Sequence, residues 1–120
     1  MANEITLKVE LQVRNGNLVD TFSIGSQSIT QAAVGGPTPG YFTLGTSEEE
    51  LAFAELSSKG VCLIQNLDAT NYIEYGFATG GPYGARVPAG QAYVIHLNAT
   101  SLFMRANTAA CKVLVKAYER

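Results

Sequence analysis

The chain opens with a strict alternation of apolar and polar residues. Between residues 4 and 14 every second position is apolar and every residue between them is polar. A period of two over this length predicts a half-buried β-strand. The sequence Asn-Gly-Asn at residues 15–17 favours a turn. A second strand is then expected over residues 18–24 and a weaker third over 28–34.

Glycine and proline interrupt the pattern at three places. Residues 35–40 and 80–84 each combine several glycines with proline. Such segments do not hold regular structure, so exposed loops are expected at both. Residues 88–90, Pro-Ala-Gly, predict a tight turn.

Residues 46–56 allow two interpretations. Ser47 followed three residues later by Glu50 would form the capping box of a helix. Leu51 and Phe53, in contrast, alternate with small alanines as strand residues do. We favour a hairpin in which a charged tip at residues 47–50 joins two short strands.

The rest of the chain predicts further short strands. The turn at residues 66–71 joins the first two of them, and in the last one Cys111, Val113 and Val115 would face the core. The segments concerned are 61–65, 72–77, 91–97, 102–106 and 111–118. Nine or ten short strands with turns every ~8–12 residues predict an all-β chain. We expect a single antiparallel, jelly-roll-like β-sandwich that spans residues 1–120 as one domain.

Composition narrows the classes of partner. Charged residues make up 15% of the chain, against about 25% in an average soluble protein. The net charge is −2 and the eight basic residues are scattered, whereas nucleic-acid binding needs clustered cations. No signal-peptide pattern and no long apolar stretch is present. We therefore expect neither a nucleic-acid nor a membrane partner.

The residues that could carry chemistry are few. The one histidine, His96, has no carboxylate marked as its partner, so a structural or surface role is expected rather than a catalytic one. Asp68 stands in a turn without the further carboxylates of a calcium loop, and the acidic run 48–50 resembles a solvated tip. Cys62 and Cys111 lack metal-ligand spacing and are expected to be buried thiols. No catalytic residue, metal or cofactor is expected.

A resemblance to a known group of proteins rests on residues 60–76. This segment reads Gly60-Val-Cys-Leu-Ile-Gln-Asn-Leu-Asp-Ala-Thr-Asn-Tyr-Ile-Glu-Tyr-Gly76. It resembles small virion proteins of tailed bacteriophages, in which a strand ending Asn-Leu-Asp leads into a strand closed by glycine. The similarity covers roughly residues 41–119 and includes Arg86-Val-Pro-Ala-Gly90 and Leu102-Phe-Met-Arg-Ala106. Residues 44–51 resemble the hairpin that precedes this unit.

The resemblance implies a non-enzymatic structural protein of the virion, made in the cytoplasm of the bacterial host. Within that group it implies a capsid decoration, or cement, protein that binds the outer surface of the major capsid protein shell and stabilises it. Neck and tail components belong to the same group, and a receptor- or glycan-binding module is the alternative from another class. Decoration proteins of this type are commonly trimers, and the long free edge of the strand over residues 4–14 invites pairing with another chain. A homotrimer is expected.

With so little charge, a partner must be held by surface complementarity. We expect the binding site at the loops 35–40 and 80–84, with Phe77 and Tyr83 as aromatic anchors and Arg86 as a hydrogen-bonding group at the rim. Residues 1–4 are the second place to look.

Overall fold

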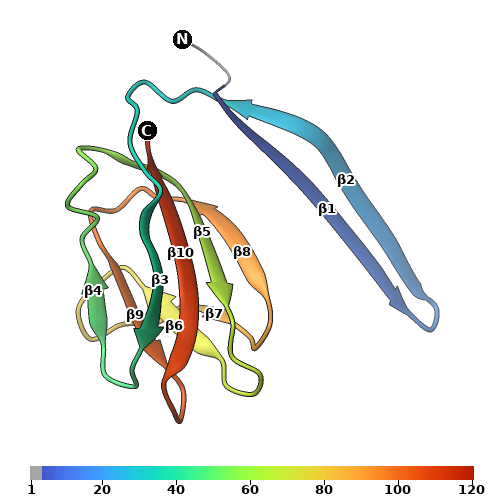
Figure 1. Ribbon diagram of the computed structural model, residues 1–120. Coiled ribbons are helices and arrows are strands. Elements are labelled where there is room, and N and C mark those ends of the chain that lie inside the picture. Colours follow the sequence, from blue (N-terminus) through green and yellow to red (C-terminus); the bar gives the residue numbers. More distant parts are fainter. Residues whose placement is uncertain (1–3) are drawn as a thin grey trace. The chain divides into compact units, whose positions relative to one another are not determined.

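The computed structural model describes residues 4–120, which contain ten strands and no helix (Figure 1). Every strand pair is antiparallel, so the prediction of an all-β antiparallel fold is confirmed. Two compact units are formed, divided after Ala33. The strands are β1 (Ile5–Asn15), β2 (Leu18–Ile29), β3 (Thr38–Leu44), β4 (Glu49–Leu51), β5 (Lys59–Asn66), β6 (Ile73–Gly76), β7 (Ala85–Val87), β8 (Ala92–His96), β9 (Leu102–Ala106) and β10 (Cys111–Glu119).

The first unit is a single long hairpin. β1 pairs with β2 from Ile5 opposite Ile29 down to Asn15 opposite Leu18, and Gly16 turns the chain with a φ of 57°. The predicted turn is confirmed. The separate strand predicted over 28–34 is wrong, because β2 runs on to Ile29. Gly25 interrupts the alternation of the sequence, but the hairpin accommodates it as a β-bulge.

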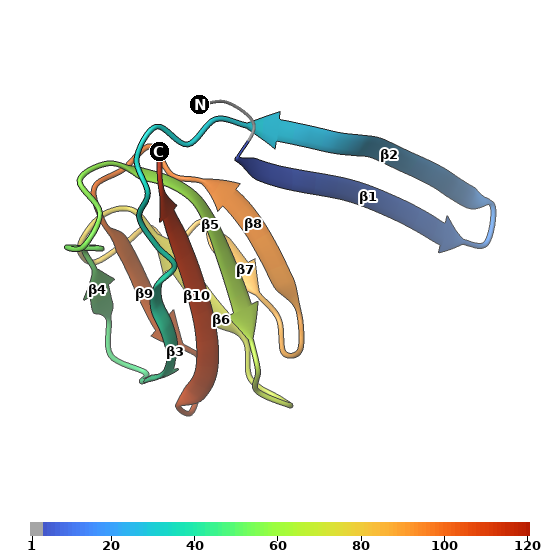
Figure 2. The same ribbon diagram turned by 45° about the horizontal axis from the view of Figure 1, so that its top comes forward.

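The second unit is a sandwich of two four-stranded sheets, ordered β3-β10-β5-β8 and β4-β9-β6-β7 (Figures 1 and 2). Consecutive strands alternate between the two sheets, except that β6 and β7 lie in the same one. This connectivity is that of a jelly roll. Of the described strands, β1 and β2 pair only with each other, so the sandwich is built from residues after Ala33 and not from the whole chain. The number of domains stays a prediction.

The hairpin predicted over residues 46–56 is wrong. β3 pairs with β10 and β4 pairs with β9, so the chain crosses from one sheet to the other between them. The helix alternative is absent as well. The predicted loop 35–40 is partly a strand, since β3 begins at Thr38. Pro39 is tolerated there because β3 is an edge strand of its sheet.

The segment between β5 and β6 also changes sheet, where the sequence suggested a turn closing a hairpin. Asp68 shapes this crossing: its Oδ2 accepts hydrogen bonds from the backbone N–H of Asn71 at 2.7 Å and of Thr70 at 3.1 Å. These bonds stabilise the ionised form and lower the pKa of Asp68. Asp68 thus stabilises a turn, as expected from the sequence, but this turn connects strands of two different sheets instead of closing a hairpin.

Both cysteines lie in the core between the sheets, buried and unpaired as predicted. Burial raises the pKa of the Cys62 thiol to about 12. Burial also raises the pKa values of Cys111 and Tyr75. The core side of the last strand is as expected, with Cys111, Val113 and Val115 all fully buried.

The buried thiol makes the sandwich sensitive to alkali. The unfolded chain releases the Cys62 proton near pH 9.0, whereas the folded chain holds it to about pH 12. Between these values the free energy of unfolding is expected to fall with rising pH, with Cys62 contributing about 1.4 kcal/mol per pH unit. Denaturant unfolding of the wild type and of Cys62→Val across this range measures the slope. Equal slopes for the two proteins would contradict the assignment.

Candidate partner-binding surface

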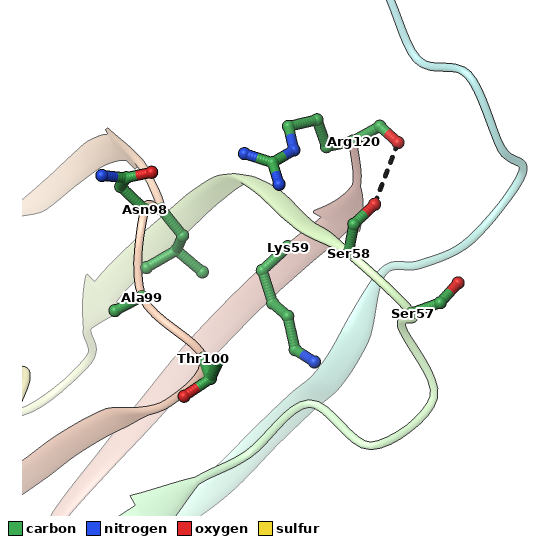
Figure 3. A pocket seen from close by; sticks show the side chains of 8 residues that line it. Ser57, Ser58, Lys59, Asn98, Ala99, Thr100 and Arg120 are labelled. Carbon is green, nitrogen blue, oxygen red and sulfur yellow. Dashed lines mark hydrogen bonds between the residues drawn. The ribbon is translucent and has the colours of Figure 1, made fainter.

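The sandwich has several recesses on its surface. One lies at the end where β5 begins and β10 ends, with Lys59, Thr100 and Arg120 among its lining residues (Figure 3). Its volume is about 180 Å³, below the ~300–1,000 Å³ of ordinary ligand pockets. Lys59 Nζ donates a hydrogen bond to the Leu56 carbonyl at 3.0 Å, and the Ser58 hydroxyl donates to the Arg120 carbonyl at 3.2 Å. These two side chains are thus bonded to backbone carbonyl groups of the sandwich itself.

Phe77 lies apart from the other two predicted anchors. Along β6, Ile73 and Tyr75 are buried in the core while Glu74 lies on the outer face. Phe77 continues the Tyr75 row: the two rings meet edge to face with centroids 6.2 Å apart. It lines a depression of about 330 Å³ with His96, Asn98 and Ala99. The structure therefore does not bring Phe77 together with Tyr83 and Arg86.

Arg86 belongs to a row of alternating charges across the outer face of the sheet β4-β9-β6-β7. Glu74 on β6 is flanked by Arg105 on β9 and by Arg86 on β7, each its direct cross-strand partner. Arg105 Nε donates to Glu74 Oε1 at 2.6 Å. The Arg86 guanidinium lies over the ring of Tyr72, 3.9 Å from its centroid. Both contacts restrict the guanidinium groups before any partner arrives.

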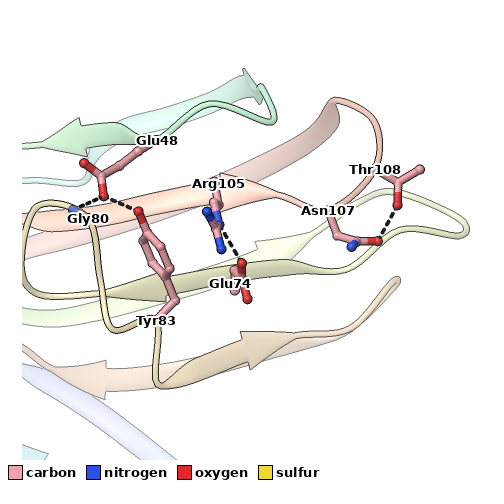
Figure 4. Close-up of polar contacts among 7 residues, drawn as sticks. All are labelled: Glu48, Glu74, Gly80, Tyr83, Arg105, Asn107 and Thr108. Carbon is pink, nitrogen blue, oxygen red and sulfur yellow. Dashed lines mark hydrogen bonds and ion pairs between the residues drawn. The ribbon is translucent and has the colours of Figure 1, made fainter.

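Tyr83 lies beside the same row. Arg105 covers its ring at 4.2 Å from the centroid, and its hydroxyl donates to the carboxylate of Glu48 (Figure 4). The backbone N–H of Gly80 donates to the same Glu48 oxygen at 2.7 Å. The hydrogen bond to Glu48 raises the pKa of Tyr83, since only the protonated hydroxyl can donate this bond, and the charge of the carboxylate raises the pKa further.

We call the set formed by Tyr72, Glu74, Tyr83, Arg86 and Arg105 the tyrosine–arginine face. It presents two aromatic rings and two guanidinium groups on a sheet of fixed geometry. Tyr and Arg dominate the centres of protein–protein interfaces because they combine apolar area with hydrogen bonding and lose little entropy when held. The face is suited to a protein surface rather than to a small molecule.

Sequence reasoning found two members of this face and missed the others. Glu74 and Arg105 meet through strand pairing over 31 residues, and no local signal marks that pairing. Glu48 was assigned to a solvated tip, which is wrong: it anchors the 80–84 loop. Glu50, from the same acidic run, accepts a hydrogen bond from the Ser101 hydroxyl at 2.7 Å.

The other predicted loop is held close to the sandwich. The Gly35 carbonyl accepts a hydrogen bond from the Glu119 N–H at 3.1 Å. Gly36 has a φ of 101° and faces the backbone of Ala117 and Tyr118, so no side chain fits there. Residues 1–3, part of the second predicted place, lie outside the described residues.

No cluster of metal-ligating side chains is found among residues 4–120. The same residues include no helix that could span a membrane. No protein family, no curated protein and no solved structure was found to match this chain.

Proposed function

We propose that this protein is a non-enzymatic structural protein of a tailed-bacteriophage particle, a capsid decoration protein that binds the outer surface of the major capsid protein shell. The virion class rests on the resemblance carried by residues 60–76 and the motifs after it. The tyrosine–arginine face is the observation that supports a protein partner. Tyr83 and Arg86 are its anchors, and Phe77 stays a prediction on a separate part of the surface.

The composition fits such a role. A decoration protein is held at many equivalent sites and must stay folded on an exposed shell. Charged residues are only 15% of the chain, so binding is expected to depend on surface fit more than on attraction between net charges. The face offers N–H donors of Arg86 and Arg105 to carbonyl or carboxylate groups of the shell, beside the rings of Tyr72 and Tyr83.

Removal of the two anchors is expected to abolish decoration. The variant Tyr83→Ala with Arg86→Ala should bind empty capsids of the same phage roughly 1,000-fold more weakly, because interface hot spots cost about 2 kcal/mol or more each on truncation. Co-sedimentation over a concentration series measures the affinity, and the melting temperature of the capsid reports stabilisation. An unchanged circular dichroism spectrum confirms that the variant is folded.

The chain offers a matched control on the outer face of the other sheet. Tyr41 on β3 is 69% exposed and Lys112 on β10 is exposed, so Tyr41→Ala with Lys112→Ala removes the same kinds of side chain and the same charge. This control should bind like the wild type. Equal binding by both double variants would contradict the assignment of the face. Wild-type protein found at a single vertex of the particle would indicate a neck or tail component instead, and retention on a glycan array a carbohydrate-binding module.

A further inference from the structure

Two recesses of the sandwich lie on either side of one short segment, residues 97–100, which connects β8 to β9. The first, of about 180 Å³, lies where β5 begins, and we call it the polar recess. The second, of about 330 Å³, lies beside Phe77, and we call it the aromatic recess. Asn98 and Ala99 line both. The two recesses therefore adjoin each other, and one extended ligand can reach both.

The polar recess contains two cations without an acidic partner. Lys59 Nζ donates one of its three N–H groups to the Leu56 carbonyl at 3.0 Å, which leaves two for a ligand. Over the described residues the structure has one ion pair, Arg105 with Glu74, so no described carboxylate neutralises Lys59 or Arg120. A carboxylate is the natural complement of an ammonium and a guanidinium group, because both donate charge-assisted hydrogen bonds to its oxygens.

The acidic residue nearest in the chain does not line this recess. Glu119 is 8% exposed, and its Oε2 accepts a hydrogen bond from the Ser57 hydroxyl at 2.6 Å. The side chains that line the polar recess therefore contribute two positive charges and no negative one.

Backbone pairing fixes the walls of the polar recess before a ligand arrives. The Arg120 N–H donates to the Ser58 carbonyl at 3.1 Å, and the Ser58 hydroxyl donates to the Arg120 carbonyl at 3.2 Å (Figure 3). The Leu97 N–H donates to the Gly60 carbonyl at 2.8 Å. Gly60 permits this close packing, since a Cβ there would lie 3.2 Å from Arg120 Cα. A site that is formed in advance loses less entropy on binding.

The aromatic recess offers uncovered ring surface. Phe77 is 53% exposed, although its edge-to-face contact with Tyr75 holds the ring in place. His96, the last residue of β8, is exposed and lines the same recess. The volume lies within the ~300–1,000 Å³ of ordinary ligand sites. An aromatic side chain placed here would cover apolar area and gain ring contacts with Phe77.

The residue between the two recesses favours a peptide as the ligand. The side chain of Asn98 is exposed, and its amide offers both a donor and an acceptor, which matches the C=O and N–H of a peptide group. In an extended peptide, side chains two residues apart point to the same side. An aromatic residue and an acidic residue at this spacing can enter the two recesses while the peptide backbone crosses Asn98. An inorganic anion would fill the polar recess alone.

We propose that this end of the sandwich binds an extended segment of another protein, in which an aromatic residue is followed two positions later by aspartate or glutamate. Phe77 and His96 receive the aromatic side chain, and Lys59 and Arg120 bind the carboxylate. The site shares no residue with the tyrosine–arginine face. Its experiment needs no capsid, so failure of the proposed function leaves it standing, and the reverse also holds.

The probe is the synthetic peptide acetyl-Phe-Ala-Asp-amide, titrated into the isotopically labelled full-length protein and followed by NMR at low salt. The amides of residues 58–60, 77 and 96–100 should shift with a dissociation constant of about 1 mM. Asparagine in place of the aspartate, or serine in place of the phenylalanine, should each weaken binding at least ~5-fold. No shift of these amides at ~10 mM peptide would overturn the proposal. Equal binding of inorganic phosphate and the peptide would show an anion site only, and would also overturn it.

Substitutions in the protein test the same assignment from the other side. Lys59→Gln with Arg120→Gln should bind the peptide at least ~10-fold more weakly, and Phe77→Ser at least ~5-fold. The matched control is Lys112→Gln with Lys116→Gln on β10, which removes the same charge from the outer face of a sheet. It should bind like the wild type. Equal weakening by both charge variants would show that net charge alone decides binding, and would contradict the site. The peptide variants, measured on the wild type, keep the test valid if Phe77→Ser disturbs the fold.

Discussion

Replacing Asn66 with aspartate is expected to lower the free energy of unfolding of the sandwich by about 4 kcal/mol or more. The side chain is fully buried at the end of β5. Its Nδ2 donates to the carbonyls of Asn71 at 2.8 Å and Val87 at 3.1 Å, and its Oδ1 accepts from the Asp68 N–H at 2.9 Å. A carboxylate places an acceptor against those two carbonyls. Each buried group left unsatisfied costs about 1–3 kcal/mol, and burying the charge adds to that.

The position matters because Asn66 joins two connections between strands, the one from β5 to β6 and the one from β7 to β8. Its side chain holds the segment that crosses from β5 to β6 and the end of β7. Its backbone N–H donates to the Gln91 carbonyl at 2.9 Å, and its carbonyl accepts from the Gly90 N–H at 3.1 Å, which fixes the turn before β8. Loss of this side chain therefore removes several hydrogen bonds together and loosens the whole segment that crosses between the sheets.

Denaturant unfolding followed by circular dichroism measures the effect, with Asn98→Asp as the control. Asn98 is exposed, so the same chemical change there should alter stability by less than ~0.5 kcal/mol. A second variant, Asn66→Ala, removes the donor without adding charge and should be destabilised less than Asn66→Asp. Equal stability of Asn66→Asp and Asn98→Asp would contradict the role given to these hydrogen bonds.

Strand positions could be predicted from the sequence because alternation and turn residues are local signals. The strand over 102–106 matches β9 residue for residue, and the strand over 111–118 is one residue shorter than β10. In both strands every second side chain is apolar, and a polar turn lies on either side. Only one orientation of the strand then buries the apolar face. The first strand was found for the same reason.

The assignment of strands to sheets could not be predicted in this way. A short polar connection can close a hairpin or cross between layers, and both use the same residues. The crossing at 66–71 is decided by the buried amide of Asn66, which bonds to a carbonyl 21 residues away on β7. No pattern in the sequence marks that partner. The connection from β3 to β4 was misassigned for the same reason.

The candidate site was predictable only in part. Glycine–proline loops and exposed aromatic or basic residues pointed to Tyr83 and Arg86. The groups that orient Tyr83 come from β9 and from the segment before β4, and pairing brings them in from 22 and 35 residues away. Phe77 was included because it is near in sequence, but alternation along β6 places it with core-facing Tyr75.

Replacing Gly76 with alanine is expected to displace the 80–84 loop and to weaken partner binding without replacing any side chain of the tyrosine–arginine face. Gly76 is the last residue of β6 and is buried. A Cβ there would collide with the backbone carbonyl of Pro82. Because the obstacle is backbone rather than a flexible side chain, the loop must move, at a cost of about 1–3 kcal/mol. Tyr83 follows Pro82 directly, so its ring should leave Arg105 and its hydroxyl should leave Glu48.

The pKa of Tyr83, followed by an NMR titration, reports that displacement before any capsid is added. The hydrogen bond to Glu48 raises this pKa above 10.0, so in Gly76→Ala it should fall back toward that value, and capsid affinity should fall as in the variant without Tyr83. Gly84→Ala is the matched control in the same loop, since a Cβ at Gly84 meets nothing within 4 Å. It should keep the raised pKa and bind normally. If the Tyr83 pKa stays raised in Gly76→Ala, the strand has moved instead of the loop. If the Tyr83 pKa stays raised and capsid binding is nevertheless weak, the decisive contacts lie outside the loop.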